Sequence, residues 1–191
     1  GYRNMSDSEA NVLIQEQAQK EKMTFDDIER LSKLAISKNI AVASHDDDDI
    51  AKLQLVQSYG TTISEFPITL DVAKEATRMG MYTIAGAPNI LNGGSHSGNL
   101  SAAEAIQARV INIICSDYYP PAMLHGIFEL ANKYDEDLHR LFQLVTLNPA
   151  RAVNMDHEIG SLKPGKKADI LVIEQMSDGY PVVTSTIVDG N

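Results

Sequence analysis

The chain has 191 residues, of which 43% are hydrophobic and 22% are charged, an ordinary composition for a globular protein with a sizeable core. Its formal net charge of -10 argues against a general affinity for nucleic acid or for anionic membranes. The single cysteine, Cys115, excludes an internal disulfide, and no apolar stretch is long enough to span a membrane. We therefore expect a cytoplasmic protein that binds neither nucleic acid nor membranes.

The first part of the sequence predicts two helices. Ser6-x-x-Glu9 and Thr24-x-x-Asp27 each have the form of a capping box, in which two side chains satisfy free N–H groups at a helix start. The first motif opens a polar helix that extends to about Lys22. The second opens a helix with apolar residues on one face.

Four short apolar segments then alternate with helical segments, which is the order of a parallel α/β sheet. The expected strands cover residues 40–44, 61–64, 81–85 and 110–115. The expected helices cover residues 50–60 and 70–80 and a segment that begins at Ser101. The third strand is followed by a long loop over residues 86–99, and long loops at strand ends usually bind ligands.

The carboxyl-terminal part predicts three helices and two strands. Helices are expected over residues 122–133 and 137–147, followed by a third with Asn148 as N-cap and Pro149 as its first residue. Strands over residues 168–173 and 182–188 are expected to pair in an antiparallel sheet. The domain boundary is expected near residue 155, between an α/β domain over 1–155 and a small β segment over 156–191.

Three polar side chains follow apolar strands, and the carboxyl ends of parallel strands are where α/β enzymes assemble their sites. Asp117 follows the most apolar strand, where a buried charge needs a partner or a metal ion. Glu65 can be a metal ligand, a general base or an ordinary turn acid. His45 can be a ligand or a surface residue at a helix start. Together they predict an enzyme site.

Two further groups of residues accompany these strand ends. Asp46 and Asp47 follow His45 directly and are expected to orient its ring. A glycine-rich segment is expected to bind phosphate oxygens with its backbone N–H groups, although a simple loop is the alternative. Its residues are Gly93, Gly94, Ser95, His96, Ser97, Gly98 and Asn99.

Five motifs in this order carry a resemblance to a known family. They are SHDDD (44–48), SEFPIT (64–69), GAPN (86–89), GGSHSGN (93–99) and SDYYP (116–120). Together they resemble the phosphonate-metabolism branch of the amidohydrolase superfamily, which belongs to the bacterial carbon-phosphorus lyase pathway. The resemblance implies a (β/α)8 TIM barrel and a hydrolase that releases pyrophosphate from α-D-ribose 1-methylphosphonate 5-triphosphate.

The same resemblance implies the roles of the site residues. His45, Glu65 and Asp117 would hold a divalent metal ion such as Zn, Fe or Mn, with histidine standing in most relatives where this chain has Glu65. Asp117 would also be catalytic, by orienting or deprotonating the water, and the glycine-rich segment would hold the phosphates. A metal ion lowers the pKa of its bound water to about 7.

The chain departs from the family pattern because it has no His-x-His pair, which relatives carry at the first barrel strand. Only the four strands of a second half-barrel are expected, and four strands cannot close an eight-stranded barrel. We therefore expect the carboxyl-terminal half of a longer enzyme, with an incomplete site and little activity. Its expected partners are the ribosyl phosphonate substrate and either the missing amino-terminal half or a second copy.

Two other readings stay open at this point. An open-sheet α/β module could bind a phosphorylated ligand or a divalent cation without catalysis, using Asp46, Asp47 and Asp117, but it lacks the lysine that such a receiver-like pocket needs. A structural subunit could instead dock a partner through its β tail. Mutation of Asp117 would leave the function of such a subunit intact.

Overall fold

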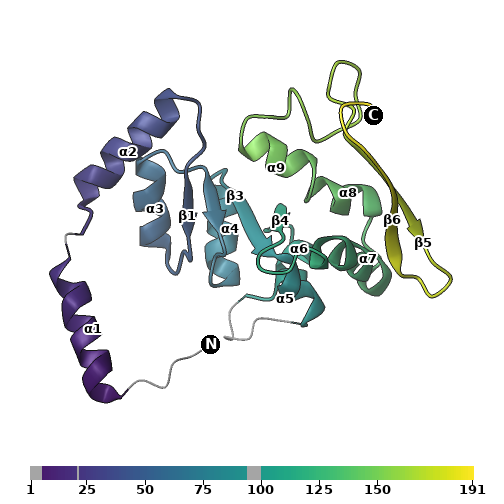
Figure 1. The fold of residues 1–191 in the computed structure, drawn as a ribbon. Coiled ribbons are helices and arrows are strands. Elements are labelled where there is room, and N and C mark those ends of the chain that lie inside the picture. Colours follow the sequence, from purple (N-terminus) through teal and green to yellow (C-terminus); the bar gives the residue numbers. More distant parts are fainter. Residues whose placement is uncertain (1–5, 21, 94–99) are drawn as a thin grey trace.

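The computed structural model describes residues 6–20, 22–93 and 100–191 and contains a four-stranded parallel sheet flanked by helices (Figure 1). The strands are β1 (Ala43–His45), β2 (Ile63–Glu65), β3 (Tyr82–Gly86) and β4 (Ile113–Cys115), and they lie in the order β1-β2-β3-β4. All three strand pairs are parallel. The predicted half-barrel arrangement is confirmed.

Several helices begin or end at residues whose side chain or backbone favours a helix end. Their bounds are α1 (Asp7–Gln19), α2 (Phe25–Ser37), α3 (Ile50–Ser58), α4 (Leu70–Arg78), α5 (Ala87–Leu91), α6 (Ala102–Gln107), α7 (Ala122–Tyr134), α8 (Leu138–Gln143) and α9 (Leu147–Ala152). Both predicted capping boxes form, at Ser6 and at Thr24. Gly60, expected to end α3, has a φ of +90°, which glycine adopts without a steric penalty.

Two predictions about the helices are wrong. The expected loop over 86–99 begins with helix α5, in which Pro88 occupies an early position that tolerates its missing N–H. The N-cap of α9 is Thr146 and not Asn148. The Asn148 side chain donates instead to the backbone oxygen of Asn112, at 2.8 Å, so it ties the helix to β4.

The two faces of the parallel sheet have different surroundings. On one face Ser64, Thr83 and their neighbours are buried beneath helices. The main hydrophobic core lies on this side and draws on the sheet and on α4 to α8; its central residues are Ala73, Ala85, Ile90, Ile106, Ile114, Ile127, Leu130 and Leu141. On the other face Ile63 and Ile113 pack against Ala152 of α9. Because side chains alternate along a strand, His45 and Glu65 project on this second face.

The tail forms the predicted antiparallel hairpin of β5 (Ile170–Gln175) and β6 (Pro181–Ile187). It lies against α7, where the rings of His125 and Tyr180 meet edge to face with centroids 4.3 Å apart. Ile173 of β5 packs against the main core. The domain boundary near residue 155 stays a prediction. Within the described ranges, no helix is both long and apolar enough to cross a membrane.

Candidate functional site

The first two strands end in the same local geometry. Asp46 follows β1 with a φ of 53°, and Phe66 follows β2 with a φ of 57°. Their N–H groups continue the sheet by donating to the backbone oxygens of Glu65 and Ile84, at 2.9 and 3.0 Å. Aspartate adopts this left-handed conformation more readily than a bulky residue such as phenylalanine. Asp117, which comes two residues after β4, also has a positive φ, of 50°.

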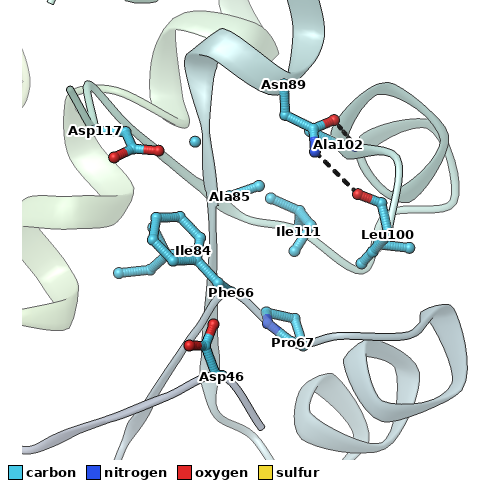
Figure 2. Close-up of a pocket in the computed structure, with 11 residues that line it drawn as sticks. Asp46, Phe66, Pro67, Ile84, Ala85, Asn89, Leu100, Ala102, Ile111 and Asp117 are labelled. Atoms are coloured by element: carbon cyan, nitrogen blue, oxygen red, sulfur yellow. Dashed lines mark hydrogen bonds between the residues drawn. The ribbon is translucent and has the colours of Figure 1, made fainter. Parts of the chain in front are cut away.

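A cavity of about 180 Å³ lies at these strand ends (Figure 2). Its lining residues come from the ends of the strands and from α5 and α6, and they are Asp46, Phe66, Pro67, Ile84, Ala85, Gly86, Asn89, Leu100, Ala102, Ile111 and Asp117. Figure 2 shows Asp46 and Asp117 toward opposite ends of the cavity, with the Phe66 ring between them in this view. Two of the residues predicted from the sequence therefore share one cavity.

The described part of the cavity lining is acidic. Its lining includes two carboxylates, from Asp46 and Asp117, and no lysine, arginine or histidine among the described lining residues. A triphosphate placed here would be repelled by both carboxylates. Any polyphosphate ligand must therefore obtain positive charge from groups outside this lining.

The three expected metal ligands are not gathered into one site. Among the described residues, no group of three His, Cys, Asp or Glu side chains comes close enough to hold a metal ion. The Nδ1 of His45 lies 3.0 Å from Oδ2 of Asp46, and its ring meets Phe66 at 5.1 Å between centroids. His45 and Glu65 are direct neighbours across β1 and β2. On their own these residues do not fit a metal ion.

Asp117 is exposed, contrary to the expectation that it carries a buried charge. Its carboxylate turns toward β3, because a Cβ atom added to Gly86 would lie 3.1 Å from Asp117 Oδ2. Glycine at this position therefore leaves the space that the carboxylate uses.

Cys115 connects the two strand-end acids electrostatically. Burial raises the pKa of its thiol above the ordinary value, and the negative charges of Glu65 and Asp117 raise it further. A backbone hydrogen bond from Asp117 acts in the opposite direction. Both carboxylates thus lie near one half-buried thiol, which stays protonated at neutral pH and is a poor nucleophile there.

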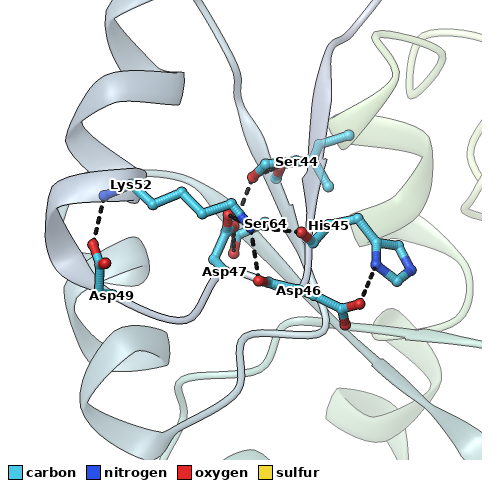
Figure 3. Close-up of polar contacts among 8 residues, drawn as sticks. Ser44, His45, Asp46, Asp47, Asp49, Lys52 and Ser64 are labelled. Atoms are coloured by element: carbon cyan, nitrogen blue, oxygen red, sulfur yellow. Dashed lines mark hydrogen bonds and ion pairs between the residues drawn. The ribbon is translucent and has the colours of Figure 1, made fainter. Parts of the chain in front are cut away.

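The sequence predicted that Asp47 orients the ring of His45. Its side chain instead joins β1 to β2 (Figure 3). Its side chain is completely buried, and Oδ2 accepts hydrogen bonds from the hydroxyls of Ser44 and Ser64, at 2.6 and 2.5 Å. The Lys52 ammonium lies 3.4 Å from Oδ1. Oδ1 accepts no hydrogen bond from any described residue, so this contact is an attraction between charges.

Lys52 also fixes the loop that carries His45. Its ammonium donates to the backbone oxygens of His45 and Asp46, at 2.8 and 2.7 Å, as Figure 3 shows. It therefore holds the left-handed turn from the helix side, while Asp47 holds it from the sheet side. This role of Asp47 could have been predicted from the sequence, because Ser44 and Ser64 each stand directly before the last residue of a strand.

Most of the glycine-rich segment, residues 94–99, lies outside the described residues. Gly93 is described, and its φ of +72° suits glycine. Asn89 secures the far end of the segment: its Nδ2 donates to the Leu100 oxygen at 3.1 Å, and its Oδ1 accepts from the Ala102 N–H at 2.8 Å. Sequence reasoning gave Asn89 no role of its own, although it stands within the GAPN motif.

Comparison with known proteins identifies the family. The Amidohydrolase family model matches residues 22–191. An alpha-D-ribose 1-methylphosphonate 5-triphosphate diphosphatase of Escherichia coli K12 is 39% identical over 154 residues, which are 80% of this chain and 40% of that protein. An adenine deaminase of Clostridium botulinum Loch Maree is 32% identical over 119 residues, 60% of this chain and 20% of that protein.

Solved structures show the same fold. The crystal structure of an amidohydrolase from Thermotoga maritima superposes with a TM-score of 0.64 at 17% identity, over 96% of this chain and 50% of that one. This chain thus spans 40% of the length of the Escherichia coli relative and half of the length of the Thermotoga maritima protein. The sheet order, the strand-end cavity and the match over residues 22–191 agree, and the chain belongs to the amidohydrolase family.

Proposed function

We propose that this chain is part of a hydrolase that releases pyrophosphate from α-D-ribose 1-methylphosphonate 5-triphosphate and leaves the 5-phosphate. The observation that carries the proposal is the 39% identity to the Escherichia coli diphosphatase over 80% of the chain. The adenine deaminase match is shorter and weaker, at 32% over 60% of the chain. Deamination of a purine base is therefore the second candidate.

In the proposed reaction, water attacks the phosphorus nearest to the ribose, and the bond to the bridging oxygen breaks so that pyrophosphate leaves. Asp117 accepts a proton from the attacking water. Its exposed carboxylate at the cavity supports this role, since solvent and substrate both reach it. The N–H groups of the glycine-rich segment bind phosphate oxygens, which supplies part of the missing positive charge.

We also propose that the site holds a divalent metal ion, with His45, Glu65 and Asp117 among its ligands. The support is the match to the Amidohydrolase family model and the two carboxylates that line the cavity. The described residues do not complete a ligand set, so we assign no step of the reaction to the metal. For the same reason we expect the isolated chain to have weak diphosphatase activity or none.

A non-catalytic receiver-like module is the less favoured reading. Asp46 and Asp117 do line one cavity, as that reading requires. Asp47, however, is buried against two serine hydroxyls and faces Lys52 rather than the cavity. The geometry therefore does not support an acidic pocket built from these three aspartates.

A chimera tests the function. The chain replaces the matched segment of the Escherichia coli diphosphatase, and phosphorus NMR follows pyrophosphate release while a parallel assay follows ammonia release from adenine. We expect pyrophosphate, and a loss of about 100-fold or more in kcat on Asp117→Asn. The matched control is Asp178→Asn in the exposed β5–β6 turn, which should keep full activity. A folded chimera that deaminates adenine, or an unchanged kcat in Asp117→Asn, would overturn the proposal.

A further inference from the structure

The cavity at the strand ends is too small for the whole substrate of the proposed reaction. Its volume is about 180 Å³, whereas pockets that enclose a drug-sized ligand usually measure about 300 Å³ or more. The charged side chains of its described lining are the carboxylates of Asp46 and Asp117, which repel phosphate groups. The cavity therefore suits one uncharged part of a substrate rather than a complete sugar triphosphate.

The ring of Phe66 lies between the two carboxylates in this cavity (Figure 2). Its edge-to-face contact with His45, at 5.1 Å between centroids, brings the ring to the end of β1. A Cβ atom added to Gly86 would lie 3.6 Å from Cε1 of Phe66 and 3.1 Å from Oδ2 of Asp117. The same ring therefore also adjoins the Asp117 carboxylate, and it spans the space between the ends of β1 and β4.

The backbone of Phe66 shows that the turn after β2 does not itself call for a large side chain. Phe66 has a φ of 57°, and its N–H donates to the Ile84 oxygen at 3.0 Å. Asp46 stands at the same point after β1, and aspartate tolerates this conformation better than phenylalanine does. Glycine would form the turn without a steric penalty. The half-buried ring, rather than the turn, therefore accounts for phenylalanine at this position.

The polar side chains of the described lining offer a ligand mainly hydrogen-bond acceptors. Asn89 uses its Oδ1 for the Ala102 N–H and its Nδ2 for the Leu100 oxygen. The carboxylates of Asp46 and Asp117 only accept. Each hydroxyl of a sugar can rotate to donate to such an acceptor, and the C–H groups of a sugar can pack on an aromatic ring. Adenine fits less well, because several nitrogens on its edge are themselves acceptors.

We propose that Phe66 is a specificity-determining residue whose ring packs against the ribose of the substrate. The ribose lies between the two carboxylates: its ring hydroxyls donate to Asp46, and its 5-carbon points toward Asp117, which takes the proton of the attacking water. The phosphates then extend beyond the acidic lining. This inference deepens the proposed diphosphatase function and rests on it for the identity of the sugar.

Binding of methyl α-D-ribofuranoside, which carries the sugar without a phosphate, tests the inference without an activity assay. The isolated chain is titrated with this probe, and NMR follows the amide of Ala85, which lines the cavity. We expect saturable binding that Phe66→Gly weakens roughly tenfold, because one aromatic contact is lost. Phe66→Tyr keeps the ring and should bind as the parent chain does. The matched control is Phe25→Ala, which removes an exposed ring of α2 and should also bind normally.

Two variants keep this test decisive. Phe66→Gly should stay folded, because glycine adopts the left-handed turn without a steric penalty. Asp46→Asn keeps the ring and should also weaken binding of the riboside, since one acceptor oxygen becomes a donor amide. Failure of the parent chain to bind the riboside, or equal binding by Phe66→Gly, would overturn the proposal. So would tighter binding of adenine than of the riboside at Ala85, which would favour the second candidate function.

The chimera separates this inference from the proposed reaction. If the chimera releases pyrophosphate, Phe66→Gly should raise KM about tenfold and change kcat less than about twofold, because the lost contact holds the sugar equally before and during the reaction. A lower kcat with an unchanged KM would contradict the role of Phe66. If the chimera releases no pyrophosphate, the proposed function fails, whereas the riboside titration still decides whether a sugar packs on Phe66.

Discussion

Replacing Lys52 with methionine removes the ammonium group that pairs with the buried Asp47 carboxylate. Asp47 is completely buried, and its Oδ1 lies 3.4 Å from the lysine nitrogen without a hydrogen bond from any described residue. Methionine keeps most of the aliphatic packing and removes the charge. The substitution therefore measures what the charge contributes to stability, apart from the shape of the side chain.

The expected loss is about 3 kcal/mol. Coulomb's law gives roughly 5 kcal/mol of attraction at this distance for an effective dielectric constant near 20. Breaking a buried ion pair by removing one partner typically costs about 3–5 kcal/mol. The Lys52 side chain is 35% exposed, so water screens part of the attraction and the low end of that range applies.

Urea unfolding followed by circular dichroism measures the effect, with Asp47→Asn and the double variant completing a thermodynamic cycle. In the Asp47→Asn background, Lys52→Met should cost less than in the parent chain, because only its two hydrogen bonds to the backbone oxygens of His45 and Asp46 are then lost. Lys74→Met, which breaks the exposed pair with Asp71, is the control and should cost less than about 0.5 kcal/mol. Equal losses in both Asp47 backgrounds would refute the reasoning.

Three further predictions concern the site. Gly86→Ala should lower the kcat of the chimera about tenfold with little change in Tm, because the new methyl group displaces the Asp117 carboxylate; an unchanged kcat contradicts this. Iodoacetamide should alkylate Cys115 with a pH midpoint above that of a free thiol, and Glu65→Gln should lower that midpoint because one negative charge is lost. Asn89→Ala should speed hydrogen exchange at the first amide of α6, and unaltered exchange would show that the side chain does not secure it.

Much of the architecture could be predicted from the sequence because it depends on local chemistry. The capping boxes at Ser6 and Thr24 fix two helix starts without any tertiary contact. The alternation of apolar segments and helices predicts a parallel sheet, since a helix must connect parallel strands. Strand starts were less accurate: β1 begins at Ala43 and not at residue 40, because its ladder with β2 begins at the Ala43–Ile63 pair.

The contacts within the site could not be predicted in the same way. The alternation of apolar segments and helices implies the strand order. That order brings Asp46 and Asp117 to one cavity. Asp47 turns away from His45 because it binds Ser64 of the neighbouring strand. Only the register of the two strands places that serine beside Asp47. Asp117 is exposed because it lies two residues beyond β4, where the sheet no longer covers it. Sequence position identified the acids but not their partners.

The distribution of charge around the cavity limits how a polyphosphate can bind. The cavity collects carboxylates, while its described lining holds no cationic side chain that would attract a polyphosphate. Lys52 and Asp47 order the strand ends, through the backbone oxygens of His45 and Asp46 and through the hydroxyls of Ser44 and Ser64. Positive charge for a polyphosphate must therefore come from groups outside this described lining, and substrate binding depends on those groups.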